Sequence, residues 1–130
     1  MMLKIDKLAE FKVDLKKKHN PEKILDTFFL FLGFKSTEIK LYKLLLNKKL
    51  TINQIKKQMN VTERTIRKYI KVLLEKKLIK RRVITEGKRL KYIYYSVSIE
   101  KAWQITKNQV EKAIKEMNDI FKKRASRKSF

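Results

Sequence analysis

Four basic side chains recur along residues 62–77 with the spacing of a single helix face: Arg64, Arg67, Lys68 and Lys71. Residues three and four apart lie on the same side of a helix, so these cations would form one charged surface. A guanidinium can bind guanine O6 and N7 bidentately, whereas an ammonium is better suited to a phosphate. The pattern therefore predicts noncovalent binding of a polyanion, with arginines that could read bases and lysines that could hold the backbone.

The first turn of the same helix adds polar candidates. Thr62 is expected to cap the helix, and Thr65 could contact a thymine methyl group or a phosphate. Glu63 could accept a hydrogen bond from cytosine, but we favour the interpretation that it complements the helix dipole. The residues that we expect to contact DNA from this helix are Thr62, Glu63, Arg64, Thr65, Arg67, Lys68 and Lys71.

A second basic cluster follows in a predicted hairpin. Residues 79–85 and 90–97 are β-branched and aromatic runs, and the four residues between them include Gly87, which is typical of a hairpin connection. Lys88 and Arg89 at its tip would suit a minor groove or its phosphates, although charges there could also only protect an edge strand. The expected DNA contacts of this hairpin, or wing, are Arg81, Arg82, Lys88, Arg89 and Lys91.

Helices must position these clusters. Helical spacing and capping residues predict helices over residues 3–17, 21–32, 36–47, 52–59 and 62–77, with Ser36, Thr51 and Thr62 as caps of the last three. Apolar residues of the helix over 62–77 would pack on the two helices before it and leave its basic face outward. The order of helices followed by a hairpin is that of a mainly α (α+β) winged helix-turn-helix, extended by N-terminal helices and a long C-terminal helix.

A long helix is predicted from residue 99 to about 122, followed by a basic, poorly ordered tail. Its apolar residues alternate in steps of four and three, which is typical of a coiled-coil seam. We expect this face to pair with a second copy of the chain; the alternative is that the helix folds back on its own domain. The residues of the expected seam are Ile99, Trp103, Val110, Ala113, Met117 and Ile120.

The remaining composition excludes other classes of site. The 130-residue chain has no Cys, one His and two Gly, which argues against thiolate or multi-His metal sites, disulfides and a glycine-rich phosphate loop. We expect no enzyme, no cofactor and no metal. The formal net charge is +22, and residues 61–91 alone hold twelve basic and three acidic side chains. The charge is thus concentrated on the predicted helix and wing.

Neither a signal peptide nor a membrane span is expected. The first eighteen residues are charged throughout, and the most apolar run, residues 24–34, is too short to cross a bilayer. We predict a cytoplasmic protein. Tyr92, Tyr94 and Tyr95 could stack on bases, but alternate aromatic residues on a hairpin more commonly pack against helices, which is the interpretation we favour.

Residues 32–102 resemble a known family. The stretch from Leu32 to Tyr42 is similar to the opening of archaeal TrmB-type regulators, which have a leucine-glycine pair, a cap and then Glu and Tyr on the first helix. Residues 61–66 and 74–79 resemble the turn, recognition helix and exit of the wider winged-helix group, which includes MarR-like and ArsR-like repressors. Tyr94 and residues 98–102 resemble the hairpin end and linker helix of the TrmB-type family. The resemblance implies transcription regulation, dimeric binding to a palindrome and a wing that contacts DNA; it identifies no effector.

The sequence thus predicts a homodimeric regulator that binds double-stranded DNA. Residues 1–34 would support the core or the dimer, 35–97 would form the DNA-binding domain, and 98–130 would dimerise and end in a basic tail. Two alternatives stay open: an RNA- or ribosome-associated winged-helix protein, and a non-catalytic module that binds another protein. Whether the regulator activates or represses depends on its operator and is not encoded in these patterns.

Overall fold

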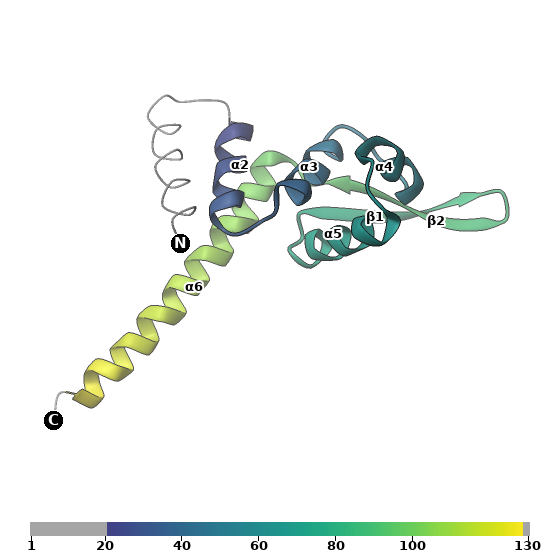
Figure 1. The fold of residues 1–130 in the computed structure, drawn as a ribbon. Coiled ribbons are helices and arrows are strands. Elements are labelled where there is room, and N and C mark those ends of the chain that lie inside the picture. The colour runs from purple at the N-terminus through teal and green to yellow at the C-terminus, as the bar shows by residue number, and fades with distance from the viewer. Residues whose placement is uncertain (1–20, 129–130) are drawn as a thin grey trace. The chain divides into compact units, whose positions relative to one another are not determined.

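The computed structural model describes residues 21–128, which form five helices and a two-stranded antiparallel sheet (Figure 1). The helix predicted over residues 3–17 and His19 lie outside the described residues. The chain divides after Ile99 into two units, and each is described by itself. In chain order the elements are α2 (Pro21–Phe31), α3 (Ser36–Leu44), α4 (Ile52–Met59), α5 (Glu63–Glu75), β1 (Ile79–Glu86), β2 (Arg89–Ser96) and α6 (Ile99–Lys128).

Local capping sets where the two middle helices begin. The Thr51 hydroxyl accepts a hydrogen bond from the amide of Gln54 at 3.3 Å, and the Gln54 side chain accepts one from the amide of Thr51 at 2.9 Å, which together form the predicted capping box of α4. Thr62 caps α5 by accepting from the amide of Thr65 at 3.3 Å. Asn60 ends α4 in the left-handed conformation, with φ of 52°.

The predicted helix over residues 36–47 begins at residue 36 as expected, but its cap and its C-terminal end were predicted wrongly. The N-cap is Lys35 and not Ser36, because the buried Glu38 carboxylate accepts a hydrogen bond from the Lys35 amide at 3.0 Å. The helix ends at Leu44, three residues before the predicted end. The Leu45 carbonyl accepts instead from the amide of Ser96 at 3.0 Å, so a strand residue takes the hydrogen bond that a further helical turn would have made.

The core of the first unit lies between α2, α3, α4 and α5. Phe29 on α2 packs its ring 5.9 Å from that of Tyr42 on α3, edge to face. On α5 the predicted inner face consists of Ile66, Ile70 and Leu73, which are buried, and Leu74, which is half-buried, so the other face is turned to solvent. The largest buried side chains of these helices include Phe29, Leu41, Tyr42, Leu45, Ile55, Ile66 and Leu73.

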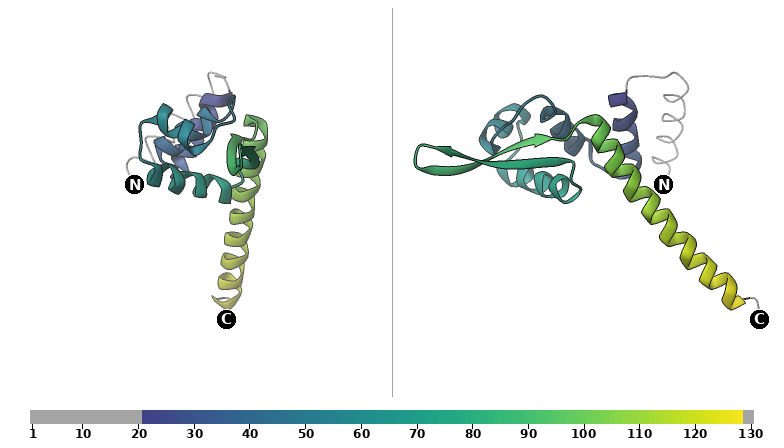
Figure 2. Two further views of the ribbon diagram at one scale, coloured as in Figure 1. Left: turned by 90° about the vertical axis from the view of Figure 1, so that its right-hand side faces the viewer. Right: turned by 180° about the vertical axis from the view of Figure 1, so that it is seen from behind.

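The wing is a regular antiparallel pair that runs from Ile79↔Ser96 to Glu86↔Arg89. Its connection has two residues, Gly87 and Lys88, and not the four that were predicted. Glycine takes a φ of 63° there, as a tight hairpin turn of this kind requires. Figure 1 and the right-hand view of Figure 2 show the distal half of the hairpin projecting beyond α4 and α5. On its other edge β2 is bridged by Leu50, through hydrogen bonds of 2.8 and 3.0 Å with Tyr94.

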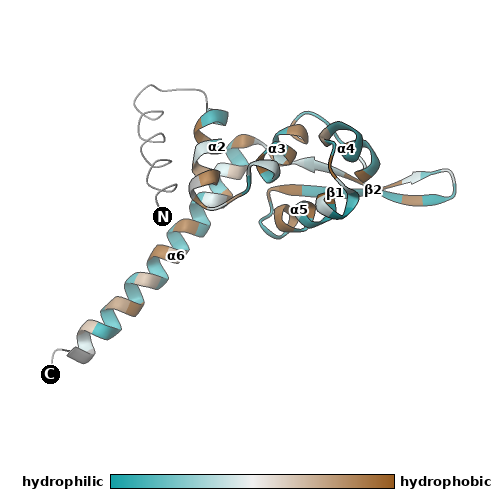
Figure 3. Ribbon diagram, viewed as in Figure 1, coloured by the Kyte–Doolittle hydropathy of each residue, from teal (hydrophilic) through white to brown (hydrophobic). Residues whose placement is uncertain are grey.

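The second unit is α6. The helix continues to Lys128, so the prediction of a poorly ordered tail was wrong for residues 122–128. This segment has no Gly or Pro and consists largely of residues that favour helices. Hydrophobic and hydrophilic residues alternate along this helix (Figure 3). Within residues 21–128, no helix is long and apolar enough to cross a membrane. Four apolar side chains of α6 are more than half exposed, namely Ile114, Met117, Ile120 and Phe121.

Candidate nucleic-acid interface

The helix α5 presents its basic residues outward. Because Ile66, Ile70 and Leu73 are buried, the opposite face of the helix is turned to solvent. The four predicted cations are all exposed on this helix: Arg64, Arg67, Lys68 and Lys71.

The two threonines of the predicted contact set are engaged with each other. The Thr62 hydroxyl donates a hydrogen bond of 2.9 Å to the Thr65 hydroxyl and accepts from the Thr65 amide. Both hydroxyls therefore hold the first turn of α5 in place, which positions the arginines that follow.

The wing presents its cations in different directions. Pairing of Arg81 with Tyr94 and of Val83 with Tyr92 puts these four side chains on one face of the hairpin, since cross-strand partners share a face. The Arg81 guanidinium lies 4.5 Å from the centre of the Tyr92 ring, a cation–π contact. Arg82 lies on the opposite face. Lys88 and Arg89 are exposed at the tip.

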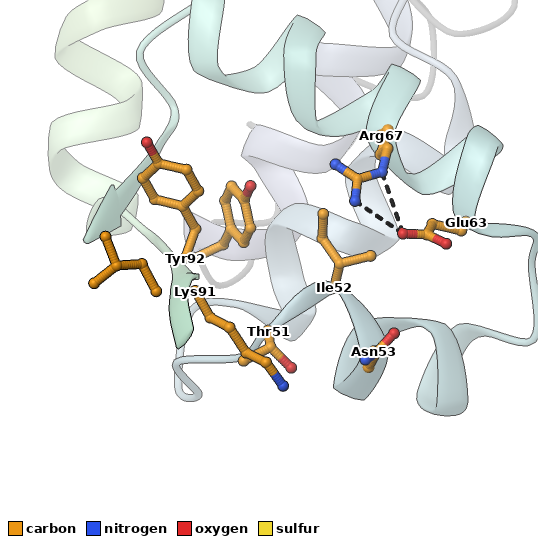
Figure 4. Close-up of a pocket in the computed structure, with 9 residues that line it drawn as sticks. Thr51, Ile52, Asn53, Glu63, Arg67, Lys91 and Tyr92 are labelled. Carbon is orange, nitrogen blue, oxygen red and sulfur yellow. Dashed lines mark hydrogen bonds and ion pairs between the residues drawn. The ribbon is translucent and has the colours of Figure 1, made fainter. Parts of the chain in front are cut away.

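A groove lies between α5, the wing and the start of α4, and we call it the α5–wing groove. It consists of two hollows of about 260 and 340 Å³, which share Ile52, Arg67 and Tyr94. Figure 4 shows the first of them. Four predicted contact cations line it, two from the helix and two from the wing: Arg67, Lys71, Arg81 and Lys91. The groove lining does not include the other predicted contact cations, which are Arg64 and Lys68 on α5 and Arg82, Lys88 and Arg89 on the wing.

Sequence reasoning missed the third wall of this groove. Thr51, Ile52 and Asn53 line the first hollow from the start of α4. The capping signal at Thr51 marked the start of this helix, but the bridge that brings it beside the wing joins Leu50 to Tyr94, far apart in the sequence. Leu90 and Tyr92 complete the lining.

Two of the four groove cations are already paired with acidic groups. Arg67 donates from Nε and Nη2 to Glu63 Oε1, at 3.3 and 2.9 Å, and Figure 4 shows the two groups facing each other. Lys91 Nζ lies 2.9 Å from Glu86 Oε2. The predicted dipole role of Glu63 is compatible with its place in the first turn of α5, but its carboxylate also holds an arginine.

The three wing tyrosines differ in burial. Tyr94 is buried and Tyr95 is half-buried, as expected for residues that pack against helices, whereas Tyr92 is 43% exposed. Tyr92 is thus more exposed than expected, although it lines the first hollow beside the start of α4.

The arrangement suits reversible binding of an anion. It offers cations, hydroxyls and an amide around an open groove, together with apolar side chains such as Ile52 and Leu90. Across residues 21–128, no group of three or more His, Cys, Asp and Glu side chains could hold a metal ion.

Solved structures of other proteins are similar to this one. A protein of Methanosarcina mazei Go1, described as a possible transcriptional regulator, superposes with a TM-score of 0.63 at 18% identity, over 78% of this chain and 88% of that chain. A ZitR variant of Lactococcus lactis gives a TM-score of 0.48 at 23% identity, over 70% of this chain and 62% of that chain. A MepR variant of S. aureus bound to an oligodeoxyribonucleotide gives a TM-score of 0.47 at 18% identity, over 89% of this chain and 92% of that chain.

The first of these similarities shows the winged-helix fold. Among curated proteins no sequence matches the chain. The family profile described as "Sugar-specific transcriptional regulator TrmB" matches residues 29–100, which is more than half of the sequence. The match extends from Phe29 on α2 through the wing. Its members are transcriptional regulators and not enzymes. This chain belongs to the TrmB family of transcriptional regulators.

Proposed function

We propose that this chain binds specific sequences of double-stranded DNA as a homodimer, with α5 in the major groove and the wing on the minor groove or the phosphates. One observation carries the proposal: exposed cations of α5 and of the wing line the same α5–wing groove. Two separate elements that present positive charge to one space suit a ligand with a continuous anionic backbone.

The helix α5 supplies the base contacts in this proposal. The major groove is wide enough for one helix, and the N-terminal part of a recognition helix usually reaches the base edges. Arg64 and Arg67 stand in the first half of α5 and are exposed. They would bind guanine, while Lys68 and Lys71 would bind phosphates.

The wing supplies contacts that depend less on sequence. Lys88 and Arg89 lie at its exposed tip, and Arg82 is exposed on the face away from α5. Side chains of this type enter minor grooves or pair with their phosphates. We expect these residues to strengthen binding to any duplex.

Dimerisation is assigned to α6. Trp103, Met117 and Ile120 are 45, 54 and 65% exposed, Ala113 is exposed, and Ile99 and Val110 are half-buried. Apolar side chains in steps of four and three on one helix are typical of a helix that pairs with another. In a two-fold dimer the recognition helices would address half-sites about 10 base pairs apart or a multiple of that.

These roles divide the chain into three parts. Residues 1–34 would support the core or the dimer, residues 35–97 would bind DNA, and residues 98–130 would pair two copies. Because DNA binding and pairing are proposed for separate segments, each can be altered by mutation without changing the other.

Selection of bound fragments from random duplex DNA tests the proposal. The expected product is a palindrome with half-sites at the spacing given above. The selected duplex should then outcompete an RNA duplex of the same sequence at equal salt. If no sequence is enriched, or if the RNA competes equally well, the proposed function is wrong.

A further inference from the structure

We infer that Glu63 determines sequence specificity by positioning Arg67: it holds the guanidinium so that its outer edge is presented to guanine, and it repels phosphate from the same place. The inference rests on the proposed function, because it assumes that α5 meets DNA. In this inference an acidic residue within a basic surface increases the selectivity of DNA binding and not its strength.

The geometry of the pair selects one edge of the guanidinium. Both hydrogen bonds, 3.3 Å from Nε and 2.9 Å from Nη2, go to the same oxygen, Oε1 of Glu63. These donors form the side edge of the planar group. The end edge, made of Nη1 and the second Nη2 proton, forms no hydrogen bond within residues 21–128. Two parallel donors on that edge match O6 and N7 of a guanine.

The position of the pair makes this edge useful. Glu63 and Arg67 are one turn apart on α5, and both line the first hollow of the α5–wing groove (Figure 4). Holding a long side chain in one geometry before binding lowers the conformational entropy that is lost on binding. Arg67 is thus prepared for a planar acceptor with fixed spacing.

The carboxylate also acts on the competing ligand. The side chains of Glu63 and Arg67 are 46 and 62% exposed, so water screens their charges in the free protein. DNA would displace this water and strengthen every electrostatic interaction at the site. A phosphate on Arg67 would then lie close to a full negative charge, whereas guanine offers neutral acceptors. Glu63 should therefore weaken nonspecific contacts more than specific ones.

A matched pair of variants tests this inference. Glu63→Gln removes the charge beside Arg67, and Glu75→Gln removes the same charge from the last turn of α5, where it lines the second hollow. The full-length proteins are compared on the duplex selected by the wild type and on a scrambled duplex, at one salt concentration. We expect Glu63→Gln to bind the scrambled duplex more tightly and to lower the ratio of the two affinities about tenfold, within the range of one bidentate base contact. Glu75→Gln should raise both affinities together and leave the ratio unchanged.

A second measurement separates positioning from a general effect on the helix. Substituting 7-deazaguanine for guanine removes N7, and this should cost the wild type more affinity than it costs Glu63→Gln at the guanine that Arg67 reads. In an Arg67→Lys background, Glu63→Gln should change the ratio less than it does beside Arg67, because a lysine has no planar edge to be positioned and only the repulsion of phosphate remains.

The outcomes distinguish the two proposals. If the wild type selects a sequence but Glu63→Gln keeps the wild-type ratio or behaves as Glu75→Gln does, the inference about Glu63 is wrong and the proposed function stands. If the wild type selects no sequence, the proposed function fails and the inference fails with it. Thermal unfolding monitored by circular dichroism tests whether each variant is folded. We expect that they are, because the cap of α5, Thr62, is unchanged in both.

Discussion

The hydroxyl of Tyr42 donates a buried hydrogen bond of 2.9 Å to the backbone carbonyl of Val97, 55 residues later in the chain. In the opposite direction the Ser96 hydroxyl donates to the carbonyl of Tyr42 at 2.6 Å. The end of α3 and the end of β2 are thus joined twice. This connection fixes the wing to the helices, and it accounts for a tyrosine at this place in α3, the first helix of the predicted DNA-binding domain.

We expect Tyr42→Phe to lower the free energy of unfolding by about 1 to 2 kcal/mol, because the buried Val97 carbonyl would lose its side-chain donor. The ring contact with Phe29 would remain. Urea denaturation measures the change. Tyr95→Phe is the control, since the Tyr95 hydroxyl forms no hydrogen bond with any residue that the structure describes. Equal stability of both variants would contradict a structural role for the Tyr42 hydroxyl.

Arg67→Ala and Lys88→Ala should weaken DNA binding in different ways. Loss of Arg67 removes a base contact and should reduce discrimination by about 1 to 3 kcal/mol at one position of the operator. Loss of Lys88 should weaken binding to all duplexes alike. Affinities for the selected and the scrambled duplex give both quantities. If both variants bind every duplex as the wild type does, the assignment of contact residues is wrong.

Binding should also depend strongly on salt. Each phosphate that is neutralised contributes about 0.9 to the slope of log affinity against log salt, so Lys88→Ala should reduce the slope by about 1. Titrations at several salt concentrations measure it. A wild-type affinity that does not change with salt would exclude a binding surface built from these lysines.

Charged residues in the seam of α6 should dissociate the dimer. Val110→Lys and Met117→Lys would place an ammonium in the expected interface, where it would lose its hydration without a partner. Sedimentation velocity should show monomers for the double variant and a dimer for the wild type. Asn108→Lys adds a charge at an exposed position on the other side of the helix and should leave the dimer intact. A double variant that sediments as the wild type does would mean that α6 is not the interface.

Asp26 and Lys43 form an ion pair, and its two partners contribute differently to the stability of the fold. Burial raises the pKa of Asp26 above its ordinary value of 3.8, although Lys43 opposes this shift, so the fold favours the protonated carboxyl. That contribution is present at low pH and is lost as the pH rises through the raised pKa. The hydrogen bond with Asp26 raises the pKa of Lys43 above 10.5, so the fold favours its charged form, and this contribution is lost only as the pH rises through that raised pKa.

Consequently Asp26→Asn should cost little stability near neutral pH, and Lys43→Met should cost more, by up to about 1 kcal/mol for a partly exposed pair. Urea denaturation at about pH 3 and about pH 7 measures both effects. The Asn variant should lack the small loss of stability that the wild type shows as the pH rises. If Asp26→Asn is the more damaging change at neutral pH, the carboxylate and not the ammonium is the partner that the fold favours.

Much of the fold follows from signals between near neighbours in the chain. Thr51 and Thr62 cap amides within one helical turn, and both were confirmed as the predicted caps. Asn60, which ends α4 in the left-handed conformation, is an equally local feature. The ion pair of Glu63 with Arg67 has the same range and was predictable from its i, i+4 spacing, but Glu63 was interpreted through the helix dipole, with a cytosine contact as the alternative. Ser36 was mistaken for a cap because its residue type is favourable, whereas the buried Glu38 decided the position.

The sequence by itself determined that α5 has a buried face and a basic face, because apolar side chains at helical spacing must leave water together. It also determined that a basic hairpin follows. Only the tertiary structure decided which cations share the α5–wing groove, that α4 forms its third wall and that Tyr92 stays exposed. The hydrogen bonds between Leu50 and Tyr94 and the register of the hairpin set these relationships. Such contacts join residues far apart in the chain, so no local pattern specifies them before the elements pack.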